Sequence, residues 1–578
     1  MTTLPKEIGT MDLEERVSYI QSATRDKRES TNDDYVDAKT PMDLEDGALV
    51  AGGALAMFSR EALGLFSQYF AIGILYGMLP GLNYPVFNNY LHMEGYQTSA
   101  YGVLVTLGWS FKVFYGMLSD CVPIFGYRRK PWMLLGWGVA TLCLCIMTFS
   151  PFPAPYCDAR EIKCPAVTPP LKNLTAKGWD KWYNFEAPNG GTKFIVLSVI
   201  VGFGYVMADC AADAMVVQYA QREPLAIRGR TQTAIYILRY LGQMVSQICT
   251  AFLLNGKEYG GSFNFAVSVN VMYGICLVPC ALIVFSTFFI LVEVKTERTP
   301  FRAWVANFWG LLQSRVMWQI CAFKFLNQVF GAFGATPATP IARTWAGVEP
   351  LNEALSGVLG SFIVSVIMAI VGKWGLHWNW RWVIALSTVG ILTIDACVVF
   401  VTIWEVFRNQ WFYNGVALTE NVPSGIRFIV ATYCAVEIAD VGNEGATYGL
   451  VTTVNNLATP FASVLFKLVD SFFDVSQTDI GRDDTRVRWE VTYTFLISYA
   501  SKLAALGWLF MLPPQKAEMQ ELKKRGGKSK LAGAILIAIF VIALVFSVST
   551  NFMSIYPSTK CYRIAGGKGY FPNGTCIK

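Results

Sequence analysis

The chain has 578 residues, of which 53% are hydrophobic and 15% are charged, with a formal net charge of +6. Soluble globular domains carry roughly a quarter of charged residues, so this composition argues against a water-soluble protein. Apolar stretches of about twenty residues, long enough to cross a bilayer, recur from position 61 to position 550. We therefore predict an all-α polytopic membrane protein.

The first predicted element is a tail. Residues 1–46 are acidic and polar and contain no apolar run, so we predict residues 1–60 to be a cytoplasmic segment that is largely disordered. No short basic segment followed by an apolar one opens the chain. We therefore expect no cleaved signal peptide, and we expect the first span to act as the signal anchor.

Thirteen apolar stretches follow, and we predict each of them to be a transmembrane helix. They lie at 61–83, 98–118, 132–150, 193–218, 230–254, 268–292, 315–337, 354–373, 382–404, 423–446, 451–474, 490–512 and 531–550. The first twelve form two halves of six helices, residues 61–292 and 315–512, joined by a cytoplasmic linker at 293–314. A basic cytoplasmic linker at 513–530 leads to an extra transmembrane helix and an extracellular or lumenal tail within 531–578.

The basic residues of the short loops predict the orientation, because lysine and arginine gather on the cytoplasmic side. With the N-terminus inside, the cytoplasmic loops read GYRRKP, QREPLAIRGR, VKTERTPFR, GKWGLHWNWR and KKRGGKSK. The short loops on the other side carry few basic residues, except for the loop with Arg482, Arg486 and Arg488. The sequence thus predicts a cytoplasmic N-terminus and an extracellular or lumenal C-terminus.

Features of secreted protein segments fall on the predicted outer side. Asn173-Leu-Thr and Asn573-Gly-Thr are glycosylation acceptor patterns. Only four cysteines lie well outside the spans on that face, and in an oxidising compartment they are candidates for two disulfides: Cys157 with Cys164, and Cys561 with Cys576. The alternative is that these are free thiols and that the acceptor sites are unused. The other ten of the fourteen cysteines are interpreted as small packing residues.

Motifs of enzymes and metal sites are missing from the sequence. It holds only two histidines, His92 and His377, which excludes a histidine-based metal cluster. Gly527-Lys528-Ser529 resembles the end of a phosphate-binding loop, but the required upstream glycine is replaced by Leu522. This basic linker is of the kind that meets anionic lipid. We expect no enzymatic activity, no metal or cofactor, and no nucleic acid partner.

Ionisable residues inside the predicted spans are the main candidates for a functional site, because a charge there is costly unless it is paired or hydrated. They are Lys112, Asp209, Asp213, Arg239, Lys324, Asp395, Glu437, Asp440, Lys467 and Lys502. Each one alone is equally consistent with a structural ion pair. Since both signs are present, and Arg239, Lys324 and Lys467 could neutralise acids of spans four and ten, the set favours a hydrated solute pathway.

Spans four and ten carry a matching acidic pattern. Span four reads Ala208-Asp209-Cys-Ala-Ala-Asp213-Ala, and span ten reads Ala439-Asp440-Val-Gly-Asn-Glu444-Gly. The two acids of each pair are four residues apart, so both carboxylates lie on one face of a helix. Six spans separate the pairs, as parallel repeats of two six-helix halves require.

One stretch resembles a known family more specifically. Residues 109–130 read WSFKVFYGMLSDCVPIFGYRRK. The pattern from Gly116 to Asp120, followed by the run from Gly126 to Lys130, resembles the loop after the second helix of major facilitator transporters. Its insertion Cys-Val-Pro-Ile-Phe, with Lys112 before it, resembles the folate–biopterin transporter family. ADCAADAMVV and GNEGATYGLVTTVNN add to this resemblance, which spans positions 61 to 512 in order.

The resemblance implies a major facilitator fold with an extra C-terminal transmembrane helix, and secondary-active transport of folates or pterins by alternating access. Folate is a dianion with a flat polar ring. Its carboxylates would suit the buried cations Arg239, Lys324 and Lys467, with Arg239 able to bind in a bidentate manner. Asp213 and Glu444 could hydrogen-bond the amino-pyrimidine edge of a pterin. Aromatic residues of the spans could stack on the ring, for example Tyr76, Phe203 or Phe330.

Two further roles follow for charged residues. Asp209, Asp213 and Asp440 are candidates for proton coupling, because a carboxylate that takes up a proton outside and releases it inside would link transport to a proton gradient. Asp120 lies at the cytoplasmic end of the second helix, where nearby arginines can pair with it. We assign Lys112, Asp120, Arg128 and Arg129 to conformational gating. Positive-inside topology alone would explain the arginines but not Asp120.

Two other functions remain open at this point. The chain could be a carrier for another organic solute, such as a nucleoside, a sugar or a drug, or a non-transporting receptor or structural protein of the membrane. In each case the protein lies in the lipid bilayer. A carrier would in addition bind a small-molecule substrate, and protons are its candidate coupling ions. The acceptor sites and outer cysteines favour a membrane of the secretory route, most simply the plasma membrane.

Overall fold

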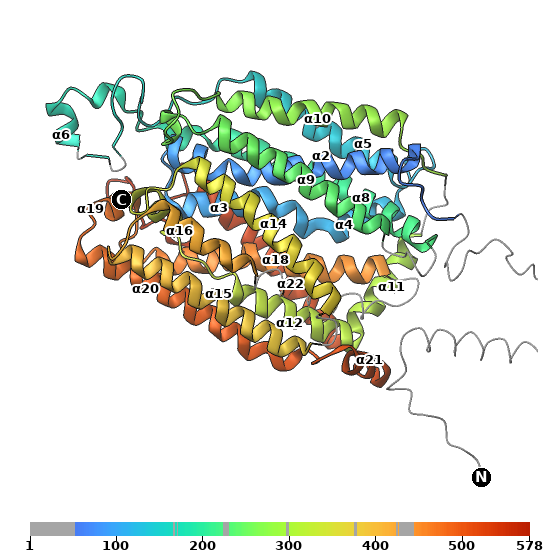
Figure 1. Ribbon diagram of the computed structural model, residues 1–578. Helices are drawn as coiled ribbons and strands as arrows, with labels where there is room; N and C mark the ends of the chain where they lie inside the picture. Colours follow the sequence, from blue (N-terminus) through green and yellow to red (C-terminus); the bar gives the residue numbers. More distant parts are fainter. Residues whose placement is uncertain are drawn as a thin grey trace, which may run out of the picture.

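The computed structural model describes residues 53–165, 168–169, 171–223, 230–295, 300–374, 378–422, 426 and 444–577. Most of these residues form long helices that run side by side (Figure 1). Helices of residues 60–289 lie along one edge of the bundle, and most of those that follow lie along the other. Of the predicted tail at 1–60, residues 1–52 lie outside the described residues.

Six long stretches of helix make up the first half, counting α3, η2 and α4 as one stretch. Their bounds are α2 Arg60–Gly81, continued by the π-helical η1 Asn83–Tyr90; α3 Gly95–Thr106, η2 Leu107–Phe111 and α4 Lys112–Cys121; α5 Lys130–Phe149; α8 Thr192–Gln221; α9 Arg230–Leu253; and α10 Val269–Phe289. Short elements lie in the connections: α6 Leu171–Ala176, η3 Asp180–Trp182, α7 Ala187–Gly190 and η5 Lys257–Tyr259.

The second half begins after α11 Phe301–Gln313, which covers most of the predicted linker. Its helices are α12 Arg315–Gly331, α13 Ala338–Thr344, α14 Pro350–Trp374, α15 Trp380–Ile403, α16 Gln410–Ala417, η6 Leu418–Glu420, α18 Glu444–Asp470, α19 Gln477–Arg482, and α20 Thr485–Ala504 with η7 Ala505–Met511. Then come α21 Lys516–Arg525, α22 Lys530–Ile555 and η8 Arg563–Ala565.

Helices coincide with twelve of the thirteen predicted spans. The other span, 423–446, lies outside the described residues apart from position 426 and the start of α18 at Glu444. Within the described part of the chain, eight helices are both long and apolar enough to cross a membrane, and α22 is among them. Other helices, such as α9, carry more polar residues than a lipid-facing span would, as expected of helices that line a polar interior.

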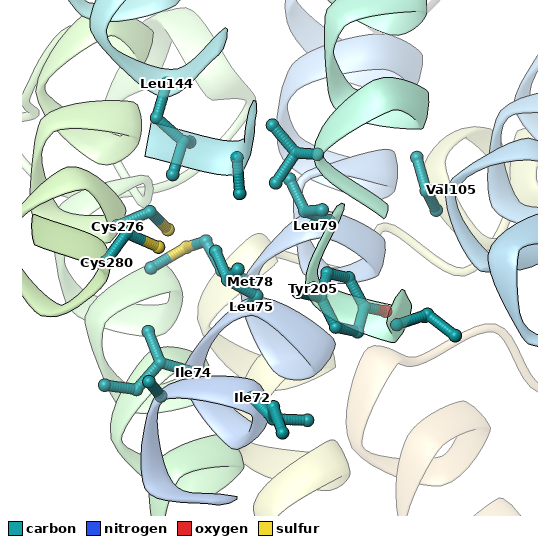
Figure 2. Close-up of a cluster of buried hydrophobic side chains, with 14 of the residues drawn as sticks. Ile72, Ile74, Leu75, Met78, Leu79, Val105, Leu144, Tyr205, Cys276 and Cys280 are labelled. Atoms are coloured by element: carbon teal, nitrogen blue, oxygen red, sulfur yellow. The ribbon is translucent and has the colours of Figure 1, made fainter. Parts of the chain in front are cut away.

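The first half has an apolar core in which most of α2 is buried. Figure 2 shows Ile74, Met78 and Leu79 of α2 among side chains of neighbouring helices, with Cys276 and Cys280 of α10 on one side. All five side chains are buried. Since lipid tails are as apolar as these side chains, close packing rather than water exclusion holds such helices together.

Glycines allow two pairs of helices to touch through their backbones. A Cβ atom at Gly73 of α2 would overlap the carbonyl oxygen of Arg239 on α9, and one at Gly242 of α9 would overlap the carbonyl oxygen of Phe70. Gly204 of α8 approaches α5 in the same way, since its Cβ would lie 2.6 Å from the carbonyl oxygen of Gly136. Small residues at membrane helix contacts serve this close approach, and here it fixes the position of Arg239.

We expect Gly73→Ala to destabilise the protein by about 1–3 kcal/mol, because overpacking forces backbones apart. The change should also displace Arg239 and reduce function, since the atom in conflict is the backbone oxygen of Arg239 itself. Thermal stability of the detergent-solubilised protein measures the first effect. Gly138→Ala on α5 is the matched control, because no atom lies within 4 Å of its added methyl group. Equal stability of the two variants would contradict the prediction.

Both disulfides lie at one end of the bundle, which the sequence predicts to face outside and which we call the outer end. They join Cys157 to Cys164 and Cys561 to Cys576. In Figure 1, α6, α19 and the C-terminus lie at this end, and α11 and α21 lie at the opposite one. Asn173 and Asn573 are both exposed.

The two halves meet closely at the outer end. Gln477 donates from its backbone N–H to Glu94 Oε2 at 2.8 Å, and Ser262 Oγ donates to Glu349 Oε2 at 2.8 Å. The hydroxyl of Tyr84 donates to the carbonyl oxygen of Val348 at 2.5 Å. Burial raises the pKa of Glu94, and the hydrogen bond from Gln477 opposes this rise. The outer end is thus closed between the halves.

The segment after α22 folds back over the outer end and contacts both halves. Lys568 Nζ lies 2.9 Å from Asp474 Oδ1 and 2.6 Å from Asp479 Oδ2, both of which follow α18. Although burial opposes it, these hydrogen bonds raise the pKa of Lys568. On the other side, Lys560 Nζ donates to Oδ1 of Asn189, which lies just before α8. Residues 556–577 therefore bridge the halves at this end.

Candidate functional site

The two acids of α8 share one cation. Lys112 Nζ lies 2.9 Å from Asp209 Oδ2 and 2.6 Å from Asp213 Oδ2. The acids are one helical turn apart, so both carboxylates face α4, where Lys112 is the first residue. The sequence placed Lys112 among the gating residues because of its motif, whereas the structure places its ammonium between two candidates for proton coupling.

A second cation, Arg239 on α9, completes this cluster. Its Nη1 lies 3.7 Å from Asp209 Oδ1. The guanidinium carbon is 4.7 Å from the ring centre of Tyr76 and 4.6 Å from that of Trp109, distances typical of cation–π contacts. Two cations and two carboxylates therefore balance in charge. We call Lys112, Asp209, Asp213 and Arg239 the charged cluster.

The two carboxylates differ in their access to solvent. The side chain of Asp209 is 0% exposed, and that of Asp213 is 36% exposed. Tyr69 of α2 donates a hydrogen bond of 2.7 Å to Asp213 Oδ1. Among the described residues, neither oxygen of Asp209 accepts a hydrogen bond of good geometry, so its ion contacts with the two cations balance its charge. Of the two carboxylates, Asp213 is therefore the one in contact with solvent.

A break in the second helix positions Lys112. Residues Leu107–Phe111 form the 3₁₀ segment η2 between α3 and α4. A 3₁₀ turn winds more tightly than an α-helix, so the residues after it are rotated relative to those before. Trp109 lies within this segment, and its ring centre is 4.9 Å from Lys112 Nζ. A short 3₁₀ stretch inside a long helix often marks a functional hinge.

The motif at 116–130 lies at the end opposite the outer one and is held within the first half. Arg129 Nη2 is 2.6 Å from Asp120 Oδ1. The backbone N–H groups of Arg128 and Arg129 donate to Glu293 Oε1 at 2.9 and 2.8 Å. Glu293, which follows α10, was not singled out from the sequence. Because these partners belong to the first half and to the first residue of the linker after it, the contacts tie the ends of α4, α5 and α10 together. A gating role stays a prediction.

The predicted site residues of the second half are more dispersed. Asp440 lies outside the described residues, as does the side chain of Glu444. Lys324 lies on α12 and is half-buried. Of the aromatic candidates, Tyr76 contacts Arg239, Phe203 packs against Phe111 at 5.0 Å between ring centres, and Phe330 packs against Trp508 at 6.2 Å.

Lys467, which the sequence assigned to substrate binding, takes a different position. Its side chain is 0% exposed. Its Nζ donates to Asn551 Oδ1 at 2.7 Å and to Ser554 Oγ at 2.8 Å, and both partners belong to α22. A fully enclosed ammonium with two neutral partners joins helices rather than presenting a charge to a solute. We therefore do not include Lys467 in the site.

Comparison with known proteins relates this chain to transporters. Residues 73–154, a range that includes the motif at 109–130, match the model of the BT1 family. A protein of Synechocystis sp. named "Folate-biopterin transporter" is 22% identical over 484 residues, which cover 80% of this chain and 84% of that protein.

Solved structures show the fold. A D-xylose-proton symporter aligns with a TM-score of 0.53 at 12% identity, over 78% of this chain and 97% of its own. A POT family transporter in complex with a thioalcohol conjugated peptide aligns with a TM-score of 0.53 at 10% identity, over 77% and 96%. The fold is therefore that of an all-helical membrane protein like the major facilitator transporters.

Proposed function

Because residues 73–154 match the model of the BT1 family and the fold is like that of the major facilitator proteins, we propose that this chain is a BT1-family transporter. It would carry folates or pterins across a membrane by alternating access, coupled to protons. The observation that carries this proposal is the charged cluster, in which Lys112 bridges Asp209 and Asp213 while Arg239 rests against aromatic rings. The name of the relative from Synechocystis supports the choice of substrate class.

Charge balance supports joint binding of a proton and an anion. With both carboxylates ionised, the four charges of the cluster sum to zero. Protonation of Asp213 would leave an excess of one positive charge, which is unfavourable away from bulk water. A carboxylate of the substrate would restore the balance by binding Lys112 or Arg239. A proton and an anionic solute would thus be favoured together and released together.

The aromatic residues beside the cations suit a flat ring. Tyr76 and Trp109 meet edge to face with ring centres 5.9 Å apart. Offset or edge-to-face contacts with a third aromatic group are favourable at such positions. Asp213, as a partly exposed acceptor, would hydrogen-bond the amino group of a pterin. Lys324 and Glu444 remain candidates from the second half.

The same proposal includes the wider organisation of the chain. Residues 61–292 and 315–512 would form the two moving halves, and α22 would be an additional span beyond the twelve. The N-terminus would lie in the cytoplasm, and the outer end, with its disulfides and acceptor asparagines, would face the outside of the plasma membrane. The basic linker at 513–530 would lie against the inner leaflet.

Uptake into cells that lack their own folate and pterin carriers tests the proposal. We expect labelled folate or biopterin to accumulate above the level of empty cells, and more at acidic than at neutral outside pH. Unlabelled pteridines should compete, whereas a nucleoside and a sugar should not. Arg239→Gln should abolish uptake, and Arg486→Gln, on the exposed outer face, is the matched control. Competition by nucleosides or sugars alone would overturn the substrate class.

A further inference from the structure

A polar pocket that is separate from the charged cluster lies at the outer end between the halves. Its volume is about 230 Å³. The first half contributes Asn89, Tyr156, Lys257 and Glu258 to its lining, and the second half contributes Arg343 and Val348. No residue of the charged cluster lines it. The pocket is therefore a separate site in the closed outer interface.

Arg343 brings a cation without a counter-ion to this pocket. Its Nη1 donates to the carbonyl oxygen of Asn88 at 3.0 Å and lies 2.7 Å from Nδ1 of His92. Within the described ranges, no carboxylate pairs with Arg343, and its Nε and Nη2 have no hydrogen-bond partner. Burial lowers the pKa of Arg343, which is the expected response of a cation that lacks an acid to offset its desolvation.

The residues around the pocket do not balance the positive charge of Arg343. His92 Nδ1 faces an arginine N–H, so this nitrogen accepts and the ring is neutral. Glu258 is drawn toward Arg160, with 3.8 Å between Oε2 and Nη2. Lys257 adds a further positive charge to the lining. With Arg343 and Lys257 against Glu258, the lining carries an excess of one positive charge.

Aromatic surface lies next to this charge. The ring of Tyr156 stacks on His92 with 4.4 Å between ring centres, and it meets Tyr183 edge to face at 5.7 Å. Both tyrosines line the pocket. The disulfide between Cys157 and Cys164 follows Tyr156 directly, and both cysteines line the pocket, so the bond restrains the same wall. Free guanidinium donors beside aromatic walls are suited to a carboxylate attached to a ring.

We infer that this outer pocket binds an aromatic carboxylate, with Nε and Nη2 of Arg343 holding the carboxylate and Tyr156 and Tyr183 contacting the ring. Pockets that enclose a drug-sized ligand measure about 300–1,000 Å³, so this one has room for one end of an extended solute. The inference rests on the proposed function in one respect, since the benzoyl-glutamate end of folate also carries carboxylates close to an aromatic ring, on the glutamate rather than on the ring itself. It would then be a first binding step on the outer face.

Binding of 4-aminobenzoate to the purified full-length protein in lipid nanodiscs tests the pocket directly. Isothermal titration should detect one site in the wild type and at least a tenfold loss of affinity in Arg343→Gln. Glutamine keeps one N–H donor for the Asn88 carbonyl. It removes the positive charge and the paired N–H groups of the guanidinium that would hold a carboxylate. Arg343→Lys, which keeps the charge, should lose less. Arg486→Gln should bind as the wild type does, because Arg486 is exposed and does not line the pocket.

No binding to the wild type, or equal affinity in the wild type and Arg343→Gln, would overturn the inference. Titration with folate separates this result from a failure of the proposed function. Folate should still bind Arg343→Gln at the charged cluster. If folate binds no variant while 4-aminobenzoate still requires Arg343, the proposed substrate is wrong and the outer pocket stands.

Discussion

Asp213→Asn is expected to lower the ratio of uptake at acidic to neutral outside pH to about one, because an amide does not titrate. In the wild type this ratio should exceed one, since protonation of Asp213 would favour entry of an anionic solute. Asp213 is the partly exposed member of the pair, and Tyr69 and Lys112 both contact it. Uptake of labelled folate by cells expressing each variant, corrected for the amount of protein at the cell surface, measures the ratio.

The same change one turn away provides the comparison. Asp209→Asn removes a fully enclosed carboxylate that balances Lys112 and Arg239. Loss of one partner from a buried ion pair costs about 3–5 kcal/mol, so this variant should lose folded protein and uptake at both pH values. If Asp213→Asn keeps the pH dependence of the wild type, Asp213 is not the proton site.

Asn551→Leu is expected to destabilise the protein by about 1.5–3 kcal/mol, the range for hydrogen bonds to charged groups. Asn551 Oδ1 accepts from Lys467 in a fully enclosed position between α18 and α22. The ammonium of Lys467 donates to Asn551 and to Ser554, so with leucine at position 551 it would keep only Ser554 of these two partners. A lower unfolding temperature of the detergent-solubilised protein is the measurement.

A double variant isolates this interaction. Lys467→Met removes the charge with a side chain of similar length, so the pair Lys467→Met and Asn551→Leu should recover most of the loss. Ser549→Leu is the matched control, because Ser549 lies on the same helix but is exposed. A single variant as stable as the control, or a double variant less stable than Asn551→Leu, would contradict the assignment.

The helices were largely predictable because the bilayer imposes their length and composition. Each span needs about twenty apolar residues. The stretch 132–150 meets this requirement, and the structure shows it as α5, Lys130–Phe149. The spacing of Asp209 and Asp213 also predicted a shared face, since it follows from helix geometry alone. The resemblance to the folate–biopterin transporter family is confirmed.

The partners of these charges were not predictable, because they depend on which helices touch. Lys112 contacts α8 directly after the 3₁₀ turn η2, and the residues WSFKVF contain no sequence signal that predicts this turn. Tyr69 and Trp109 look like ordinary packing residues of an apolar run, although one donates to Asp213 and the other contacts both cations. Lys467 resembled a pathway cation, and only the fold places it against α22.

The pairing of Lys467 with α22 bears on the order in which the chain is made. Synthesis proceeds from the N-terminus, so α18 is complete well before Asn551 and Ser554 of α22 leave the ribosome. During that interval the ammonium of Lys467 lacks the two side chains that satisfy it in the finished protein. An unsatisfied charge at this depth disfavours tight packing. Packing of α22 against α18 therefore supplies the partners of Lys467 and completes this part of the second half.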